Sequence, residues 1–197
     1  MGNHGWGGNP PESDAAARQR IIDAAAACID RHGVAKTTLS DVAQELGVTR
    51  QTVYRHMGSI SEILSEVARQ GAADFVDRLV AHLAGSQNPA EAVVNGFLFC
   101  LEFVPRDPRL NLLLEFGDAD TFGRAATSPI TLEYGAQVLR RFPVTWSDGG
   151  VTEDDLPGLA EMILRLLISM LQNPTTPPRP IADVRNFLER WLAPALG

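Results

Sequence analysis

The 197-residue sequence contains only two cysteines and no uninterrupted apolar run long enough to cross a membrane. A membrane-spanning helix needs about 20 consecutive apolar residues, and the most apolar stretch, residues 162–171, is interrupted by Arg165. Cys28 and Cys100 each lie within an apolar helical pattern, which favours small buried side chains over a disulfide. We therefore expect a cytoplasmic protein in a reducing compartment.

Motifs of catalytic and metal-binding sites are also missing. The four histidines are scattered, and the sequence has no His-Glu-x-x-His, Cys-x-x-Cys, Gly-x-Ser-x-Gly or glycine-rich phosphate loop. The alternation of apolar and polar residues that is typical of strands is absent as well. The sequence therefore predicts an all-α protein that is not an enzyme and that requires neither a metal nor a cofactor.

Acidic residues are in excess, but they are unevenly distributed. The net charge is −7 and the pI is about 5.0, which argues against a nucleic-acid partner. Residues 13–69, however, carry seven basic and seven acidic side chains, so the whole excess lies in the rest of the chain. A near-neutral N-terminal part with a local basic surface is compatible with DNA binding of moderate salt dependence.

Residues 37–56, TTLSDVAQELGVTRQTVYRH, have the pattern of two short helices joined by a tight turn. The apolar residues of the first helix recur at helical spacing: Leu39, Val42, Ala43 and Leu46. Gly47 follows at the position where a left-handed residue ends a helix. Thr49 is predicted to cap the second helix, and Val48 to pack on Val53 as a hydrophobic staple.

The second helix is mostly polar. Only Val53 and Met57 are aliphatic between residues 49 and 57, and they lie four positions apart on one face. The other side chains bind phosphates and base edges in many proteins: Arg50, Gln51, Thr52, Tyr54, Arg55 and His56. A merely solvated surface helix is disfavoured because the turn, the cap and the polar face occur at mutually consistent positions. The pattern predicts a DNA-binding helix-turn-helix.

Residues 33–64, GVAKTTLSDVAQELGVTRQTVYRHMGSISEIL, resemble the DNA-binding segment of TetR-type transcriptional regulators. The resemblance is specific over residues 14–70 and rests on helical layout afterwards. It implies an N-terminal three-helix helix-turn-helix head at residues 13–58, preceded by a flexible arm at residues 1–12. It also implies a larger C-terminal helical ligand-binding and dimerisation domain at residues 59–197, whose first helix, residues 59–84, connects it to the head.

The resemblance also implies roles for individual side chains. It makes Arg50, Gln51 and Tyr54 base or groove contacts. It assigns phosphate contacts to Thr38, Thr49, Thr52, Arg55 and His56. Ile60 replaces a lysine that usually binds phosphate in the family, so the backbone N–H groups near Ser59 are expected to bind phosphate without it. Arg18 and Arg20, near the start of the first helix, are either further phosphate contacts or solvated charges.

Helices are also predicted over residues 89–103, 109–116, 125–142, 156–171 and 181–192. The helix at residues 156–171 is apolar nearly all round, so more than one side must be covered. In TetR-type proteins the last two helices form a four-helix bundle between subunits. The resemblance therefore implies a homodimer interface that includes Leu159, Ile163, Leu167, Met170, Phe187 and Trp191. Packing within one chain is the alternative.

Aromatic residues are frequent in the C-terminal part, where this fold class has its ligand cavity. The candidate lining residues are Phe97, Leu101, Phe103, Phe116, Phe122, Tyr134, Trp146 and Met162. Such a lining suits a hydrophobic or aromatic small molecule, with Glu102, Glu115 and Tyr134 as candidates for polar anchoring. The alternative that these aromatics fill a core remains open at this stage.

The resemblance therefore implies a homodimeric repressor on a double-stranded, pseudo-palindromic DNA operator. Two recognition helices about 34–36 Å apart would read successive major grooves. An effector would release the protein by favouring another spacing, and a preference of about 3 kcal/mol, or ~100-fold, is ample. A TetR-like activator is an alternative. So is a helical small-molecule carrier or partner-binding protein without DNA binding, for which Ile60 and the near-neutral head argue.

Overall fold

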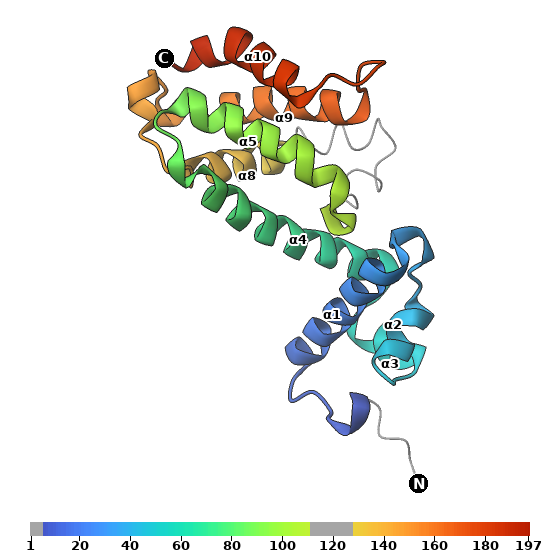
Figure 1. The fold of residues 1–197 in the computed structure, drawn as a ribbon. Coiled ribbons are helices and arrows are strands. Elements are labelled where there is room, and N and C mark those ends of the chain that lie inside the picture. The colour runs from blue at the N-terminus through green and yellow to red at the C-terminus, as the bar shows by residue number, and fades with distance from the viewer. Residues whose placement is uncertain (1–5, 111–127) are drawn as a thin grey trace. The chain divides into compact units, whose positions relative to one another are not determined.

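The computed structural model describes residues 6–110 and 128–197, and every regular element within these ranges is a helix (Figure 1). The all-α prediction is confirmed. Over the same residues, no helix combines the length and the apolar character that a membrane span requires.

The chain divides into two compact units. Unit 1 comprises residues 1–73 with residues 107–115, and unit 2 comprises residues 74–106 with residues 116–197. The division falls inside helix α4 (Ile60–His82) rather than at residues 58/59, the predicted domain boundary. The first part of the connecting helix therefore belongs to the same compact unit as the helix-turn-helix.

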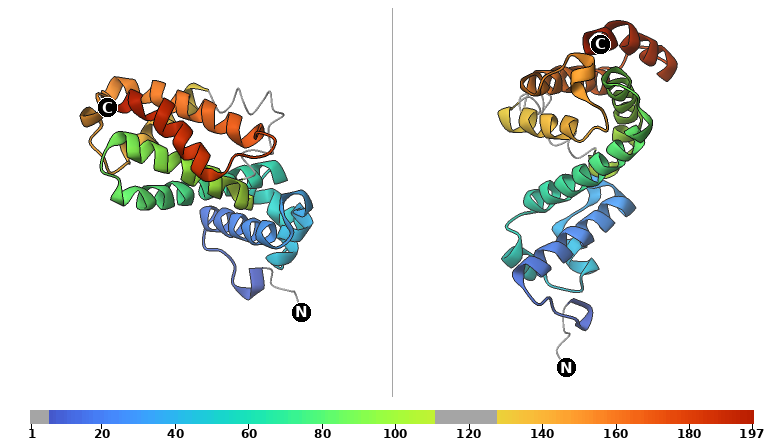
Figure 2. Two further views of the ribbon diagram at one scale, coloured as in Figure 1. Left: turned by 45° about the horizontal axis from the view of Figure 1, so that its top comes forward. Right: turned by 90° about the vertical axis from the view of Figure 1, so that its left-hand side faces the viewer.

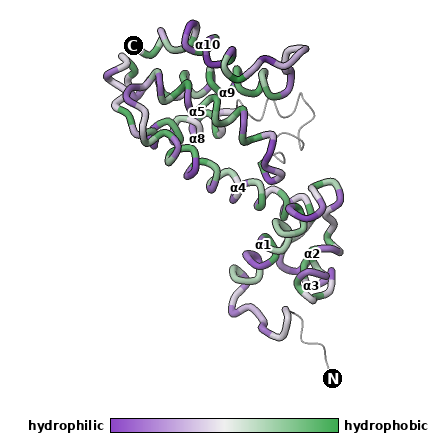
Figure 3. Tube along the Cα trace, viewed as in Figure 1, coloured by the Kyte–Doolittle hydropathy of each residue, from purple (hydrophilic) through white to green (hydrophobic). Residues whose placement is uncertain are grey.

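Unit 1 is built on α1 (Asp14–His32), α2 (Leu39–Glu45), α3 (Arg50–His56) and the start of α4. Ser13 caps α1 by accepting a hydrogen bond from the Ala16 N–H at 3.1 Å, and Gly33 ends the helix with φ of +78°. Hydrophobic residues recur along α4, visible as the alternation of green and purple in Figure 3. This is the pattern of a helix with one buried face.

The core of unit 1 is one apolar cluster. It includes Ile21 and Ile29 of α1, Val42 of α2, Val53 of α3 and Ile63 of α4, each with no exposed surface. Burial of this kind is the main stabilising contribution for short helices, which are marginal in isolation. Residues 107–110 pack against the same unit: Leu110 is buried, and the Arg109 guanidinium is paired with the Asp30 carboxylate of α1.

Unit 2 is organised around α5 (Pro89–Phe103), which is buried on nearly all sides. Helices α9 (Leu156–Gln172) and α10 (Ile181–Trp191) pack against α5, and α8 (Pro129–Arg140) packs mainly against α9 (Figures 1 and 2). Asn88 caps α5, since its side-chain oxygen accepts a hydrogen bond from the Glu91 N–H at 2.9 Å.

Short 3-10 turns complete the two units. One precedes α1 (Trp6–Gly8), and two others close unit 2 (Trp146–Gly149 and Ala193–Leu196). The turn at Trp6 was not expected, because residues 1–12 were predicted to be a flexible arm. Trp6 is only 7% exposed and belongs to the apolar cluster of unit 1.

Two of the predicted helices include residues that the structure does not describe, and one of them also ends earlier than predicted. The helix predicted over residues 125–142 is observed as α8 and ends at Arg140, and residues 125–127 lie outside the described residues. Most of the helix predicted over residues 109–116 also lies outside them.

Candidate nucleic-acid interface

The turn between α2 and α3 is closed by a hydrogen-bond pattern that requires a left-handed residue. Gly47 has φ of +63°. Its N–H donates to the Gln44 carbonyl at 3.0 Å, and the Val48 N–H donates to the Ala43 carbonyl at 2.9 Å. These two bonds form a Schellman motif, in which glycine avoids the Cβ clash of a left-handed backbone. The predicted role of Gly47 is confirmed.

Helix α3 is held at its start and along its inner face. The Thr49 hydroxyl accepts a hydrogen bond from the Thr52 N–H at 3.2 Å, which confirms the predicted cap. Val53 and Met57 have no exposed surface, and Val48 packs against the cluster that contains them. The inner face of the seven-residue helix α3 is therefore fixed in the core, and the other side chains of α3 lie outside the core.

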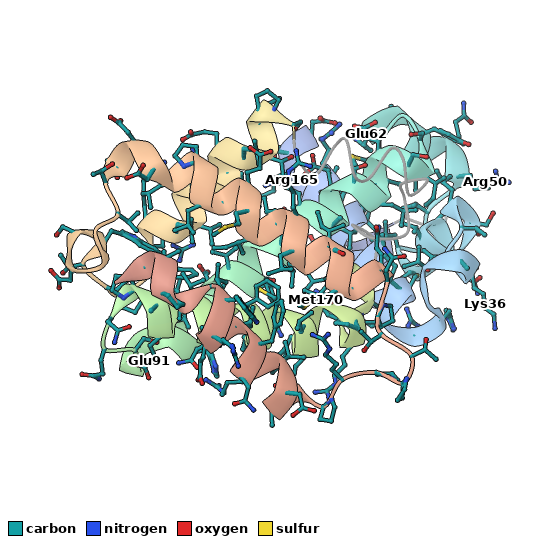
Figure 4. The ribbon with its side chains drawn as sticks, turned by 90° about the horizontal axis from the view of Figure 1, so that it is seen from above. Lys36, Arg50, Glu62, Glu91, Arg165 and Met170 are labelled. Atoms are coloured by element: carbon teal, nitrogen blue, oxygen red, sulfur yellow. The ribbon has the colours of Figure 1, made fainter. Side chains whose placement is uncertain are left out.

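The outer face of α3 presents three side chains without partners. Arg50, Gln51 and Tyr54 are exposed, with Tyr54 at 49%. Within the described ranges none of the three makes a side-chain hydrogen bond or an ion pair. Figure 4 shows the Arg50 side chain extending outward from the ribbon, as does Lys36 just before α2. These donors remain available for a ligand with acceptor groups.

The threonines predicted to bind phosphate have local partners. Thr38 caps α2: its hydroxyl lies 2.6 Å from the Asp41 carboxylate, and its N–H donates to the same oxygen at 2.8 Å. The Thr49 and Thr52 hydroxyls lie 3.0 Å apart. The spacing Thr-x-x-Asp is itself a capping-box signal, readable in the sequence. The two hydrogen bonds from Thr38 lower the pKa of Asp41.

His56 differs from the other predicted DNA contacts because both of its ring nitrogens are engaged. Its Nδ1 lies 2.6 Å from the Asp14 carboxylate of α1, and its Nε2 lies 3.3 Å from the Arg55 guanidinium. The side chain is only 13% exposed. A phosphate contact by His56 stays a prediction, and the structure adds a second role, since His56 joins the end of α3 to the start of α1.

Arg18 and Glu62 fasten the loop that follows α3. Arg18 donates to the His56 carbonyl at 2.6 Å and to the Glu62 carboxylate at 2.7 Å. Glu62 also accepts the Gly58 N–H at 2.8 Å. Arg18 is therefore neither a free phosphate contact nor a solvated charge. The expectation of backbone N–H groups open to phosphate near Ser59 is wrong at Gly58, because a carboxylate already occupies that position.

This network predicts a pH-dependent contribution to stability. The hydrogen bond from Arg18, followed by that from Gly58, lowers the pKa of Glu62 in the folded state. A carboxyl with a lowered folded pKa stabilises the fold above its unfolded pKa, and that contribution is lost as pH falls through the folded pKa. We expect Glu62→Gln to lower the melting temperature at neutral pH, with a difference from wild type that shrinks on acidification. Circular dichroism melts over a pH series measure this.

Glu66→Gln is the matched control for that series. Glu66 lies one turn along α4 and pairs with Arg69, whose side chain is 68% exposed. Such surface pairs contribute little, so the control should melt close to wild type throughout. A loss of stability in Glu62→Gln that is constant with pH would contradict the assignment.

Comparison with known proteins identifies the arrangement. The family described as "Bacterial regulatory proteins, tetR family" matches residues 21–67. This range includes the second part of α1, all of α2 and α3, and the start of α4. The "HTH-type transcriptional regulator AlkX" of Mycobacterium tuberculosis is 30% identical over 186 residues, covering 92% of this chain and 86% of that protein. The chain belongs to the TetR family.

Two further relatives agree with this TetR-family assignment. The "Probable acrEF/envCD operon repressor" of Escherichia coli K12 is 29% identical over 100 residues, covering 50% of this chain and 45% of that protein. The solved TetR-family repressor AlkX from Dietzia sp. superposes with a TM-score of 0.56 at 23% identity, over 90% of this chain and 96% of that one. The protein is thus a DNA-binding transcriptional regulator rather than an enzyme.

The candidate ligand-binding residues of this TetR-family chain fall into different environments. Phe97 is 2% exposed in the core, and the Trp146 indole N–H donates to the Leu139 carbonyl at 3.1 Å while its ring stacks on Phe142. The remaining described candidates are partly or largely exposed: Leu101, Phe103, Tyr134 and Met162. Phe116, Phe122 and Glu115 lie outside the described residues.

The residues predicted at the dimer interface also differ in how far they are exposed. Leu159 is 8% exposed and is therefore already covered within its own chain. Trp191 is 67% exposed. The others are half-buried: Ile163, Leu167, Met170 and Phe187. In Figure 4, Met170 lies on the side of α9 that faces α10, and Arg165 on the opposite side.

Proposed function

We propose that this TetR-family regulator is a homodimeric repressor whose α3 reads a pseudo-palindromic DNA operator. The observation that carries the proposal is the outer face of α3, where exposed Arg50, Gln51 and Tyr54 stand without partners on a helix capped at Thr49. Arginine and glutamine are the side chains that bind guanine and adenine edges in pairs of hydrogen bonds. Thr38, Thr49, Thr52 and Arg55 surround them as candidate phosphate contacts.

The number of exposed basic side chains near the outer face of α3 supports a moderate electrostatic attraction to DNA. Lys36, Arg50 and Arg55 are exposed in unit 1, whereas Arg18 and Arg31 are paired with Glu62 and Glu45. Each phosphate contact made by an exposed cation adds to the salt dependence of binding. The operator affinity should therefore fall with salt, but less steeply than for a strongly basic head.

A second copy of the chain is the partner that the α9 and α10 faces favour. From Ile163 onward, the apolar residues of α9 are only partly covered within their own unit. On α10, Val184 and Leu188 are buried, while Phe187 and Trp191 lie one turn apart on an adjacent, more exposed face. Apolar faces left on two neighbouring helices are typical of a bundle shared between subunits.

Trp191→Glu is expected to dissociate this dimer without unfolding the monomer. Because Trp191 is 67% exposed in the single chain, its replacement opens no cavity in the chain's own core. A tryptophan at the centre of an interface commonly contributes ~2 kcal/mol or more, so the dimer Kd should rise at least ~30-fold. Sedimentation velocity at micromolar concentration measures the change.

Ala182→Glu controls for the added charge on α10. Ala182 is exposed and, by helical spacing, lies on a different face from Trp191. This variant should remain dimeric. Equal dissociation of both variants, or of neither, would argue against an interface at Trp191.

For the effector, we propose a hydrophobic or aromatic small molecule that binds in unit 2. The apolar side chains that unit 2 leaves partly uncovered on α5, α8 and α9 support this: Leu101, Phe103, Tyr134 and Met162. The naming of the Escherichia coli relative as an operon repressor supports repression over activation. A differential affinity of about 3 kcal/mol for two head spacings would be sufficient for release.

The experiment that tests the proposal is operator binding by fluorescence anisotropy. Labelled duplexes from the DNA upstream of the protein's own gene are titrated against a scrambled duplex at two salt concentrations. We expect tight binding to one palindromic duplex at two subunits per site. Equal binding to palindromic and scrambled duplexes across a genome-derived duplex library would contradict the proposal and favour a carrier function.

A further inference from the structure

The turn at Trp6–Gly8 lies outside the helix-turn-helix and yet joins the core of unit 1. Trp6 is 7% exposed and packs in the same apolar cluster as α1, α2 and α3. Its φ of +70° is a left-handed conformation that a bulky residue rarely adopts. Such a conformation persists where surrounding contacts determine it, so the neighbours of Trp6 must hold it in this conformation.

Arg20 of α1 holds the turn in place. Its guanidinium carbon lies 5.2 Å from the centroid of the Trp6 ring, within the range of a cation–π contact. The same guanidinium donates to the carbonyl oxygens of Trp6 at 3.2 Å and of Asn9 at 2.5 Å. Arg20 is therefore committed to the N-terminal turn and is not a solvated charge on α1.

The turn also contacts the two parts of the helix-turn-helix that set the position of α3. The Trp6 ring meets the His56 ring edge-on, with centroids 6.0 Å apart and an interplanar angle of 69°. On the other side Gly7 lies near Gly47, so that a Cβ added to Gly47 would lie 3.8 Å from the Gly7 nitrogen. The turn thus lies against the end of α3 and against the loop that precedes it.

We propose that Trp6 is a positioning residue for operator recognition. It acts through His56 and the Gly47 turn and holds both boundaries of α3, a helix with only Val53 and Met57 as core anchors. Contacts to base edges require side chains placed to within about 0.5 Å and 10–20°. Trp6, itself buried, therefore determines how well the exposed side chains of α3 fit the groove. This inference rests on the proposed role of α3.

Three substitutions separate positioning from folding. Trp6→Ala removes the ring, Trp6→Phe retains an aromatic edge for His56, and Arg20→Lys releases the turn without changing the net charge. Asn9→Ala is the control, because Asn9 contributes only backbone atoms to these contacts: its N–H donates to the Trp6 carbonyl at 3.2 Å and its carbonyl accepts from Arg20. Binding is measured at a temperature where circular dichroism shows each variant fully folded, with operator and scrambled duplexes side by side.

We expect Trp6→Ala to lower operator affinity at least 10-fold, with little change in affinity for scrambled DNA. Trp6→Phe should recover most of the loss, Arg20→Lys should show a smaller loss than Trp6→Ala, and Asn9→Ala should match wild type. Operator affinity in folded Trp6→Ala equal to wild type would overturn the proposal. So would an equal loss on both duplexes, or a loss that only follows the unfolded fraction.

Amide hydrogen exchange gives a readout that needs no DNA. Faster exchange in residues 50–56 of Trp6→Ala and Arg20→Lys, with α1 and α4 unchanged, is the expected signature of a released α3. Unchanged exchange in α3 would overturn the positioning role. If wild type lacks operator specificity while α3 is released in the variants, the proposed function fails and the structural link from Trp6 to α3 stands.

Discussion

Tyr54→Ala is expected to weaken operator binding by about 1–3 kcal/mol for each α3 that carries it, the range for a side chain that contacts a base edge. Tyr54 is 49% exposed and has no partner within the described part of unit 1. Its removal therefore leaves no cavity and no unpaired group in the protein. The melting temperature should stay within a degree or so of wild type, a change typical of surface substitutions, and anisotropy titration against the operator measures the loss.

Ser65→Ala provides the matched control for Tyr54→Ala. Ser65 is exposed on α4 in the same unit, and the substitution changes no charge. It should bind operator as wild type does. Because Tyr54 carries no charge, the salt dependence of binding should be the same in both variants. If Tyr54→Ala binds the operator with wild-type affinity, Tyr54 does not contact the operator.

Gly149→Ala is expected to destabilise unit 2 by about 3 kcal/mol, the upper part of the range for overpacking. Gly149 is buried in the turn Trp146–Gly149. A Cβ there would lie 2.2 Å from the Leu196 carbonyl oxygen and 3.1 Å from the Pro89 Cβ. The Leu196 contact is with backbone, so no side-chain rotation relieves it and the C-terminal turn must move away from α5. Urea unfolding followed by circular dichroism gives the free energy of unfolding.

Gly158→Ala is the contrasting substitution in the same unit. Gly158 is exposed in α9 and a Cβ there has no neighbour within 4 Å. Alanine in an exposed helix interior is favoured over glycine by up to about 1 kcal/mol, so this variant should be as stable as wild type or more stable. Similar stabilities for the two alanine variants would mean that the C-terminal turn does not pass against Gly149.

The parts of the DNA-binding head that follow from short-range sequence patterns were predictable. Gly47, the Thr49 cap and the Val48 staple lie within a few positions of the helix ends they serve, so their spacing alone indicates their roles. The polar outer face of α3 also follows from helical periodicity. The capping box of Thr38 and Asp41 carries an equally local signal, since the two residues lie three positions apart.

The roles of Trp6, Arg18 and Gly149 could not be derived in this way. Trp6 lies in a stretch rich in glycine, asparagine and proline that has no helical or strand period. Its partner His56 lies 50 positions away, and Arg18 meets Glu62 across 44 positions. No local spacing links such residues. An arginine with a tertiary partner and a solvated arginine are identical in sequence.

The all-α class, the helix-turn-helix with its caps and the outward-facing side chains of α3 all follow from the sequence alone. These properties depend on interactions within one or two helical turns, whose geometry is the same in every protein. Only the packing of the elements reveals that Trp6 and Arg20 hold the N-terminal turn beside α3, that Arg18 and Glu62 fasten the loop after it, and that the C-terminal turn passes against Gly149. Those contacts depend on how the elements pack, and packing is set by shape complementarity over the whole unit.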